Sequence, residues 1–355
     1  MPESKKVVSK SKERKGRSLP ATPYVVGIGA SGGGLNALER FFAHLPSGCG
    51  AAFVLVTHLE PTRKSMMVEL LKKYAKIEVS EAGDDVKVMP GHLYIIPPNK
   101  DMGITGGHLH LFEPRSPHGL RHPIDFFFHS LALDQGQKAI CVVLSGTGFD
   151  GTQGLKDIKS DGGMAMVQEP KSAQYDGMPQ SAIDTGLADF ILPPEEMPGK
   201  IIEYIKHSAI IEARQGAGNG IAGAERAPGA TDQQISGDLH KILLLIRNKT
   251  GQDFAFYKKN TVRRRIEMRM ALHQMDDIAA YMRYLKQDPG EVDLLSRHFL
   301  IGVTSFFRDP GAFEGLKKKA LPLIFKNRPA QQPVRVWVPG CSTGEEAYSI
   351  AIMLR

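Results

Sequence analysis

Short apolar runs alternate with segments of helical periodicity between Tyr24 and Leu192, and this alternation constrains the fold more than any other feature of the sequence. The runs have the length of buried strands, and the segment after the first run repeats leucine and phenylalanine at helical spacing. Strands that alternate with helices predict an α/β fold with a doubly wound, mostly parallel sheet. The expected strands are Tyr24–Ile28, Ala52–Thr57, Leu93–Ile96, Ala139–Leu144, Met164–Val167 and Phe190–Leu192.

Changes in composition and in hydrophobic periodicity divide the chain into further regions. Residues 21–208 hold the alternating pattern, whereas residues 209–234 are rich in Gly and Ala and predict a flexible linker. Residues 235–298 have the periodicity of a small all-α subdomain. Residues 299–355 contain one more expected strand, Val334–Val338, which leads into a glycine turn and a helical pattern.

The positive charge is concentrated at the start of the chain. Residues 1–20 hold seven Lys and Arg side chains and two Glu, which is +5 of the formal charge of +7. We expect these residues to form a basic, disordered tail. Because the remaining body carries only +2, a nucleic-acid partner is not expected.

Other global features predict a cytoplasmic protein. No stretch of about 18 apolar residues is present, so membrane insertion is not expected, and the basic start lacks the apolar core of a secretory signal. Cys49, Cys141 and Cys341 are far apart and form no CxxC pair. Neither a disulfide framework nor a zinc site is therefore expected, which fits a reducing compartment.

Three of the expected strands end in residues that can carry hydrolytic chemistry. Ser31 follows the first strand in a glycine-rich turn, His58 follows the second, and Asp150 follows a later one. Ligands of parallel α/β sheets bind at the carboxyl ends of strands, so these side chains could converge. A serine needs a base to take its proton, a histidine titrates near neutral pH, and an aspartate can orient the imidazole.

The oxyanion of such a reaction needs hydrogen-bond donors. The backbone amides of Gly32 and Thr147 are the candidates, because both lie in glycine-rich turns next to the strand ends. Each triad candidate also has a plain structural interpretation. Ser31 could cap a helix, His58 could be a loop residue, and Asp150 could belong to a turn.

The first turn also fits a dinucleotide-binding fingerprint, Gly27-x-Gly29-x-x-Gly32. That fingerprint requires an acidic residue at the end of the second strand to hold a ribose. His58 stands there instead, and Glu60 comes two residues later. The nucleotide-binding interpretation is therefore disfavoured.

Residues 24–205 resemble the catalytic domain of the chemotaxis protein-glutamate methylesterases (CheB-type). The resemblance places the nucleophile of that family on Ser31, its histidine on His58 and its aspartate on Asp150. The family often has Met where Thr147 stands, a change that keeps a backbone donor. The motifs that carry the resemblance are IGASGGGLNALERFF, VLVTHLEPTRKSMMVELL, LYIIPP, VVLSGTGFDGTQGL and QEPKSAQYDGMPQSAIDTG.

The resemblance implies a reaction and a class of partner. Methylated glutamates of methyl-accepting chemoreceptors, or of similar methylated signalling proteins, would be hydrolysed to glutamate and methanol. Glutamine side chains would be deamidated by the same acyl-enzyme route, with neither metal nor cofactor. The receiver domain that precedes the catalytic domain in the family has no counterpart before Tyr24, so control by phosphorylation within this chain is not expected.

Residues 236–355 resemble the start of the chemotaxis receptor methyltransferases (CheR-type). By this resemblance, Thr304, Arg308, Gly340 and either Glu345 or Glu346 would contact S-adenosylmethionine. The segments that carry the resemblance are FAFYKKNTVRRRIEMRM, VTSFFRDPGAF and VRVWVPGCSTGEEAYSIA.

Two features set this second part apart from the family pattern. Gly302 stands where the family commonly has Asn, and the sequence stops at Arg355, inside the first helix after the glycine turn. We therefore expect a truncated methyltransferase fold with weak binding of S-adenosylmethionine and no methyl transfer.

A basic helix is expected over Val262–Met270. Arg265 and Arg269 form a like-charge pair at i, i+4, which costs about 0.2–0.5 kcal/mol of repulsion that an acidic partner would relieve. In the family picture the methylation helices of receptors are rich in Glu, so receptor docking is one interpretation of this face, and a solvated basic surface is the other. The residues of the face are Arg263, Arg264, Arg265 and Arg269.

A rival interpretation of the whole chain is a non-catalytic receptor-docking or scaffold protein that keeps relic esterase and methyltransferase folds. Esterase turnover separates this interpretation from the enzyme, and titration with nucleotides tests the dinucleotide-binding alternative.

Overall fold

The computed structural model describes residues 23–58, 66–114, 121–216 and 232–301 and, further on, 304, 306–308, 310–326, 329, 332–342 and 344–355. The basic tail expected over residues 1–20 lies outside these residues. None of the helices in the described ranges is both long and apolar enough to cross a membrane.

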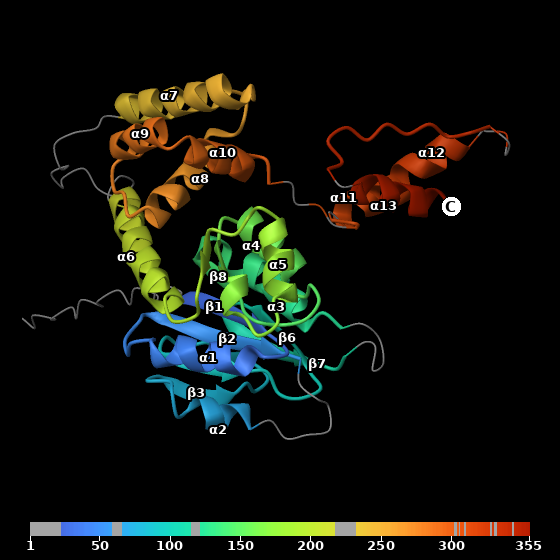
Figure 1. Cartoon of the computed structure of the whole chain (residues 1–355). Coiled ribbons are helices and arrows are strands. Elements are labelled where there is room, and N and C mark those ends of the chain that lie inside the picture. The colour runs from blue at the N-terminus through green and yellow to red at the C-terminus, as the bar shows by residue number, and fades with distance from the viewer. Residues whose placement is uncertain are drawn as a thin grey trace, which may run out of the picture.

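A seven-stranded sheet forms the centre of the N-terminal part (Figure 1). Its order is β10-β9-β8-β1-β2-β5-β3, and all neighbouring strands are parallel. The six expected strands are confirmed, and the edge strand β3 was not predicted. The strands are β1 (Tyr24–Ala30), β2 (Ala51–Thr57), β3 (Glu78–Glu81), β5 (His92–Ile95), β8 (Ala139–Val143), β9 (Met164–Gln168) and β10 (Phe190–Leu192).

Helices cover both faces of this sheet, as the alternating pattern predicts. Side chains of α1 and α6 pack on one face, and those of α3, α4 and α5 pack on the other. Every residue of β1 and β2 is buried, which explains why these strands are uniformly apolar. The helices are α1 (Gly34–Ala43), α2 (Met67–Leu71), α3 (Pro123–Gln135), α4 (Thr152–Ser160), α5 (Gly177–Asp184) and α6 (Met197–Gly216).

A small antiparallel sheet, which the sequence did not predict, packs beside α3. It consists of β4 (Val86–Lys87), β6 (Asp101–Thr105) and β7 (His108–Phe112), in the order β4-β7-β6. The Ser130 hydroxyl of α3 accepts a hydrogen bond from the backbone of Ile104 at 3.1 Å. This contact ties the small sheet to the helix that also borders the candidate site.

The next part is all-helical, as expected. It contains α7 (Asp232–Thr250), α8 (Lys259–Leu272), α9 (Ile278–Gln287) and α10 (Pro289–Phe299) around an apolar core of their own. The linker expected over residues 209–234 is shorter than predicted, because α6 continues to Gly216 and α7 begins at Asp232. The residues between them lie outside the described ranges.

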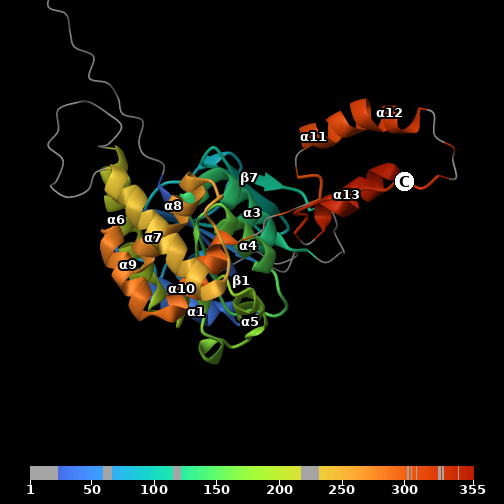
Figure 2. The same ribbon diagram turned by 90° about the horizontal axis from the view of Figure 1, so that it is seen from above.

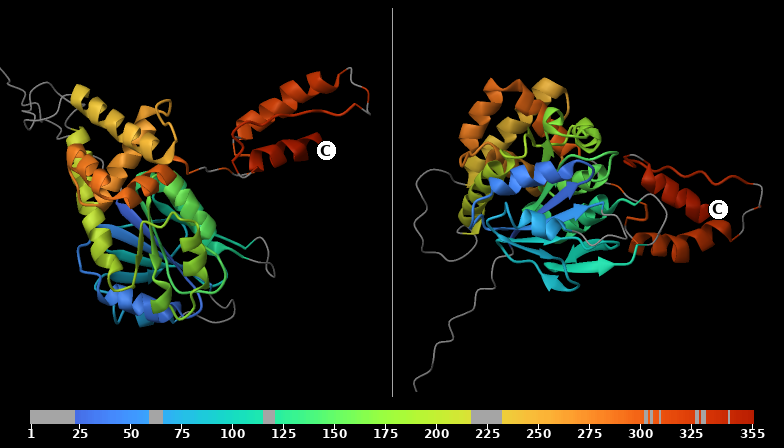
Figure 3. Two further views of the ribbon diagram at one scale, coloured as in Figure 1. Left: turned by 45° about the horizontal axis from the view of Figure 1, so that its top comes forward. Right: turned by 60° about the horizontal axis from the view of Figure 1, so that its bottom comes forward.

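The helical part is joined firmly to the esterase-like part. Met268, Ala271 and Leu272 of α8 share an apolar cluster with Ile201 and Tyr204 of α6. Figures 2 and 3 show the helices gathered over one end of the sheet domain. The two parts therefore meet through a packed interface.

Residues 310–355 differ from the rest. The structure forms α11 (Pro310–Gly315), a π-helical turn (Leu316–Ala320), α12 (Leu321–Phe325) and α13 (Glu345–Leu354). The strand expected over Val334–Val338 is wrong, since residues 333–338 have no regular secondary structure. Trp337 is 87% exposed. In the described part of this region, no strand lies beside residues 333–338 that could pair with them.

Candidate active site

Ser31 lies in the turn between β1 and α1. Its amide donates a hydrogen bond of 3.0 Å to the carbonyl of Ser145, which follows β8, and its own carbonyl accepts from Gly34. Gly33 has φ of +73°, a conformation that residues with a side chain rarely adopt. The glycine turn thus fixes Ser31 at the carboxyl end of β1.

The parallel register brings His58 beside Ser31. Ala30 pairs with Thr57, so the residues that follow β1 and β2 are neighbours at the same sheet edge. Nδ1 of His58 is 2.9 Å from the Ser31 hydroxyl, and Nε2 is 2.9 Å from Oδ2 of Asp150. The three expected triad residues form one continuous hydrogen-bonded chain.

Asp150 is the most enclosed member of that chain, with a side chain only 3% exposed. Its Oδ2 also accepts from the Ile124 amide at 3.0 Å, and Oδ1 accepts from the amides of Asp125 and Gly151 at 2.9 Å each. Ile124 and Asp125 belong to the first turn of α3, whose free amides favour a negative charge. Asp150 is thereby held as a fixed carboxylate that accepts Nε2–H of His58 and leaves Nδ1 free to accept the Ser31 proton.

The amides expected to bind the oxyanion lie in the turns that follow β1 and β8. Within the described ranges, neither the Gly32 nor the Thr147 amide donates a hydrogen bond inside the protein. Gly146 brings the second turn close, since a Cβ there would lie 2.9 Å from Cβ of Ser31 and 2.2 Å from the Met178 sulfur. Only glycine therefore allows this approach.

Sequence reasoning missed the groups that hold these turns together. The Ser145 hydroxyl accepts from the Tyr175 amide at 3.0 Å and lies 3.2 Å from the Gly32 carbonyl. The buried Gln168 side chain accepts from the Ser145 amide at 2.8 Å. A polar residue at the end of the buried strand β9 was the available signal for Gln168.

A second acidic group beside the triad was also missed. One ligand-type atom from each of His122, Asp125 and Asp150 lies within 4.8 Å of the others. Burial and the nearby charge of Asp150 raise the pKa of Asp125 to about 6, against the hydrogen bond from the Gly154 amide. The signal was His122-Pro123-x-Asp125, a proline and an acid at a helix start.

These three residues contain donor types that could hold a metal ion. However, both oxygens of Asp150 already accept two hydrogen bonds each. We therefore interpret the cluster as a hydrogen-bonded group around Asp150, and the absence of a metal requirement stays a prediction.

The segments expected to contact S-adenosylmethionine meet only in part. The Phe307 amide donates to the Ser349 hydroxyl of α13 at 3.0 Å, so the segment of Thr304 and Arg308 reaches the helix that begins with Glu345 and Glu346. Gly340 has φ of +69°, as a glycine turn requires. However, no sheet edge is formed beside this turn in the described residues, so these groups do not form a closed ligand site.

The basic face of α8 is not the open surface that was expected. The side chain of Arg269 is only 5% exposed, and it donates to Glu291 of α10 at 2.8 Å and to Asp189 at 3.3 Å. Arg265 is buried as well, and it donates to the His298 carbonyl. The prediction that Arg265 and Arg269 dock on a receptor is therefore wrong, because both side chains are buried inside the chain.

The other two arginines of that face differ from them. Arg264 lies against Gly162, 3.4 Å from the position a Cβ would take there. Arg263 is exposed and pairs with Glu267 at 2.7 Å. The acidic groups that relieve the repulsion between Arg265 and Arg269 therefore belong to this chain, because Arg269 donates to Glu291 and Asp189.

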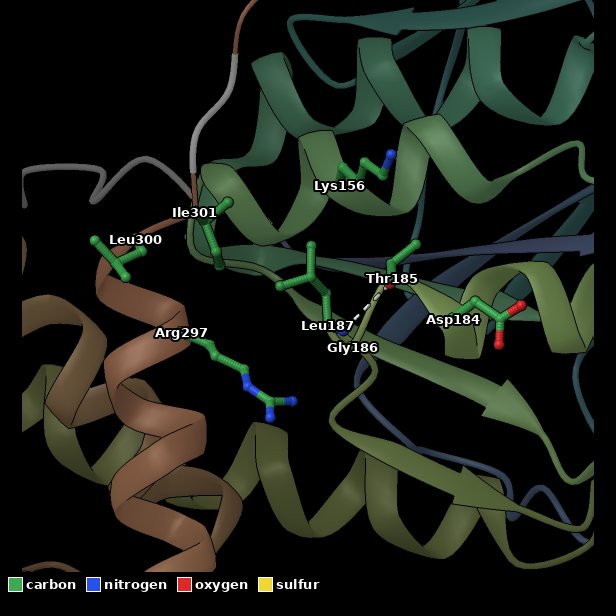
Figure 4. Close-up of a pocket in the computed structure, with 8 residues that line it drawn as sticks. All are labelled: Lys156, Asp184, Thr185, Gly186, Leu187, Arg297, Leu300 and Ile301. Atoms are coloured by element: carbon green, nitrogen blue, oxygen red, sulfur yellow. Dashed lines mark hydrogen bonds between the residues drawn. The ribbon is translucent and has the colours of Figure 1, made fainter. Parts of the chain in front are cut away.

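A cavity of about 460 Å³ lies where the two parts meet (Figure 4). Arg297 reaches from α10 toward the loop at Gly186, and Lys156 of α4 lies on the opposite side. The remaining lining residues are Asp184, Thr185, Leu187, Leu300 and Ile301. None of the triad residues lines this cavity.

Comparison with known protein families finds three matching segments of the chain. The CheB methylesterase family matches residues 26–201. The all-alpha domain of the CheR methyltransferases matches residues 237–300, and their SAM binding domain matches residues 302–355.

Individual relatives are similar to different shares of the chain. An uncharacterised 104.1 kDa protein of Rhodobacter capsulatus is 37% identical over 302 residues, which are 81% of this chain and 31% of that protein. A protein-glutamate methylesterase/protein-glutamine glutaminase of Pyrococcus abyssi is 33% identical over 203 residues, 56% of this chain and 55% of the relative. The chain thus spans about a third to just over half of the length of these relatives.

Two further relatives are covered almost completely. A putative protein-glutamate methylesterase/protein-glutamine glutaminase of Leptospira interrogans is 33% identical over 171 residues, 48% of this chain and 89% of the relative. The crystal structure of the Thermotoga maritima CheB methylesterase catalytic domain is 32% identical, covers 52% of this chain and 99% of its own, and has a TM-score of 0.49. Through residues 26–201 the chain belongs to the CheB methylesterase family, and this part is followed by the all-alpha and SAM-binding segments of the CheR methyltransferases.

Proposed function

We propose that this protein hydrolyses γ-methyl esters of glutamate side chains in proteins, with Ser31 as the nucleophile, His58 as the general base and Asp150 as the residue that orients the imidazole. The observation that carries the proposal is the chain of two 2.9 Å contacts from Ser31 through His58 to Asp150. Relatives named protein-glutamate methylesterase support the choice of substrate.

The first half-reaction forms an acyl-enzyme. Nδ1 of His58 takes the Ser31 proton while the Ser31 oxygen attacks the ester carbonyl. The negative charge on the former carbonyl oxygen is stabilised by the amides of Gly32 and Thr147. The tetrahedral intermediate then expels methoxide, which leaves as methanol with the proton held by His58.

The second half-reaction releases the acid. Water replaces methanol, and His58 removes a proton from it as it attacks the Ser31 ester. The bond to Ser31 breaks, its oxygen regains a proton from His58, and a glutamate side chain leaves. Throughout both steps Asp150 stabilises the positive charge that forms on the ring, because its carboxylate is fixed by three amides.

The surroundings of Ser31 suit a side chain presented by a large protein. Phe149 and Tyr175 are 55% and 47% exposed beside the two turns, and His58 is itself 34% exposed. Exposed aromatic groups around an open serine allow an ester on a protein surface to approach. We propose a methylated signalling protein, with methyl-accepting chemoreceptors as the first candidates.

Glutamine deamidation is a second candidate activity, because the relatives carry the name protein-glutamine glutaminase. The same acyl-enzyme would form, with ammonia leaving in place of methanol. An amide is the harder substrate, since its nitrogen must be protonated as it leaves. We therefore propose a slower rate for the amide than for the ester.

Two matched peptides test the proposal on the full chain. One carries a γ-methyl glutamate and the other a glutamine at the same position, and methanol and ammonia are measured. We expect methanol from the first peptide with wild type and none above background with His58→Gln. Equal methanol release by wild type and His58→Gln would contradict the assigned base.

A further inference from the structure

We infer that Asp125 is a positioning residue for this esterase, whose negative charge beside Asp150 strengthens the triad at neutral pH and is removed by protonation in mild acid. The inference rests on the proposed function, because it concerns the same site. The proposed chemistry above uses the backbone amide of Asp125 but not its carboxylate.

The geometry joins Asp125 to the triad through the backbone and through charge. Its amide donates to Oδ1 of Asp150 at 2.9 Å, and its own Oδ1 accepts from the Gly154 amide at 2.7 Å. The carboxylates of Asp125 and Asp150 have oxygens within 4.8 Å of each other. Asp125 therefore links the first turns of α3 and α4, and both turns border Asp150.

The two carboxylates have different surroundings. Asp150 accepts three amide hydrogen bonds and one from His58, and each of them favours its charged form. The side chain of Asp125 accepts chiefly from the Gly154 amide, with a weaker contribution from Gly151, and among the described residues it has no bond from His58. Two close carboxylates resist being charged together, so the proton that is taken up as pH falls goes to Asp125.

Other charged groups near Asp125 are few. His122, at the start of α3, faces the same cluster, and α4 presents the amides of its first turn. Within the described ranges, no lysine or arginine forms an ion pair with Asp125. Burial and the charge of Asp150 raise the pKa of Asp125 to about 6.

The catalytic consequence follows from the charge that develops during the reaction. His58 becomes positively charged in the transition state, and a second carboxylate behind Asp150 stabilises that charge. Once Asp125 is protonated, this contribution disappears. The variant Asp125→Asn imitates the protonated form, because the amide oxygen can still accept from Gly154.

The experiment compares wild type with Asp125→Asn in methanol release from the γ-methyl glutamate peptide between pH 5 and pH 8.5. We expect a kcat ratio of about ten at pH 8, falling toward one near pH 5, where both proteins lack the charge. Asp125→Glu, which keeps the charge, should recover part of the rate at pH 8. Asp157→Asn is the matched control, because Asp157 of α4 pairs with His129 at 2.8 Å, outside the cluster.

Stability gives a second readout that does not need turnover. Removing a buried charge that burial disfavours should raise the thermal midpoint of Asp125→Asn above wild type at pH 8, and this difference should shrink as pH falls from 8 toward 5. A residue that only holds the two helices together would instead give a constant rate ratio and no gain in stability.

The experiment distinguishes failure of this inference from failure of the proposed function. A rate ratio that is independent of pH, in a series where Ser31→Ala is inactive, overturns the inference and leaves the proposed function standing. Turnover that survives Ser31→Ala overturns both. A ratio that converges toward one in acid, together with the pH-dependent gain in stability, supports the role of Asp125.

Discussion

The esterase part and the region after residue 301 both carry recognisable glycine turns after an apolar run, yet only the first forms a site. In the esterase part, β1 and β2 are paired on both sides, so Ser31 and His58 are fixed at one sheet edge. In the later region, the run Val334–Val338 pairs with nothing in the described residues, and Trp337 is 87% exposed. A catalytic turn needs the sheet behind it to place its groups.

The largest expected effect comes from removing a member of the triad. His58→Gln should lower kcat by on the order of 10⁴ to 10⁶, as removal of a triad member does in other serine hydrolases. The side chain is 34% exposed, so the fold should survive the change. Methanol release and a urea unfolding curve would show both. A loss of less than tenfold would mean that this sheet edge is not catalytic.

The next effect tests how the helical part is held. Arg269→Met removes one buried cation that pairs with both Glu291 and Asp189 and should lower the free energy of unfolding by about 3–5 kcal/mol. Arg263→Met on the same helix is the control, with an expected change of at most about 0.5 kcal/mol because its pair with Glu267 is exposed. Equal losses of unfolding free energy for the two variants, measured in urea, would show that the ion pairs of Arg269 are not the buried contact described above.

A third effect is the pH dependence of the folding stability that Glu291 contributes through its buried hydrogen bonds. Burial acts to raise the pKa of Glu291, but hydrogen bonds from His273, Arg269 and Tyr281 outweigh it and lower the pKa to about 2. A lowered pKa stabilises the folded state above the unfolded value of about 4.3, and this stabilisation, about 3 kcal/mol, is lost as pH falls from about 5 to 2.

Unfolding free energies at several pH values between 7 and 2 would measure this contribution. In Glu291→Gln the acid-dependent loss should be smaller by that amount, whereas Glu267→Gln should follow wild type. A Glu291→Gln curve parallel to wild type would contradict the assigned hydrogen bonds.

The smallest expected effect belongs to the later region. S-adenosylhomocysteine at 1 mM should shift the thermal midpoint of this chain by less than about 1 °C, since no closed site is formed and we expect a Kd above about 1 mM. Calorimetry would check the same point. Micromolar binding would show that the turn at Gly340 is better supported than the described residues indicate.

Much of the esterase fold could be predicted from the sequence, because its central strands β1, β2, β8 and β9 are buried along their whole length and are therefore mostly apolar. The edge strand Glu78–Glu81 was missed for the opposite reason, since three of its four residues are not buried. The small sheet of β4, β6 and β7 was missed because its strands are short and partly polar.

The candidate site was predictable where its residues follow strands, and Ser31, His58 and Asp150 do. The side chains of Asp125 and Gln168 accept hydrogen bonds from backbone amides of other segments, and sequence spacing does not show such contacts. Arg269 was misassigned because a helical pattern does not tell which charged face will be paired and buried. The false strand Val334–Val338 has the apolar pattern without a pairing partner.

The central claim is that Ser31 is the nucleophile of an esterase, and methanol release from the γ-methyl glutamate peptide by wild type and Ser31→Ala tests it most directly. The two proteins should have the same thermal midpoint to within about 2 °C, because an alanine leaves the turn and its backbone contacts intact. The account predicts a loss on the order of 10⁴-fold or more in kcat for Ser31→Ala. A folded Ser31→Ala that keeps more than about a tenth of the wild-type rate would contradict it.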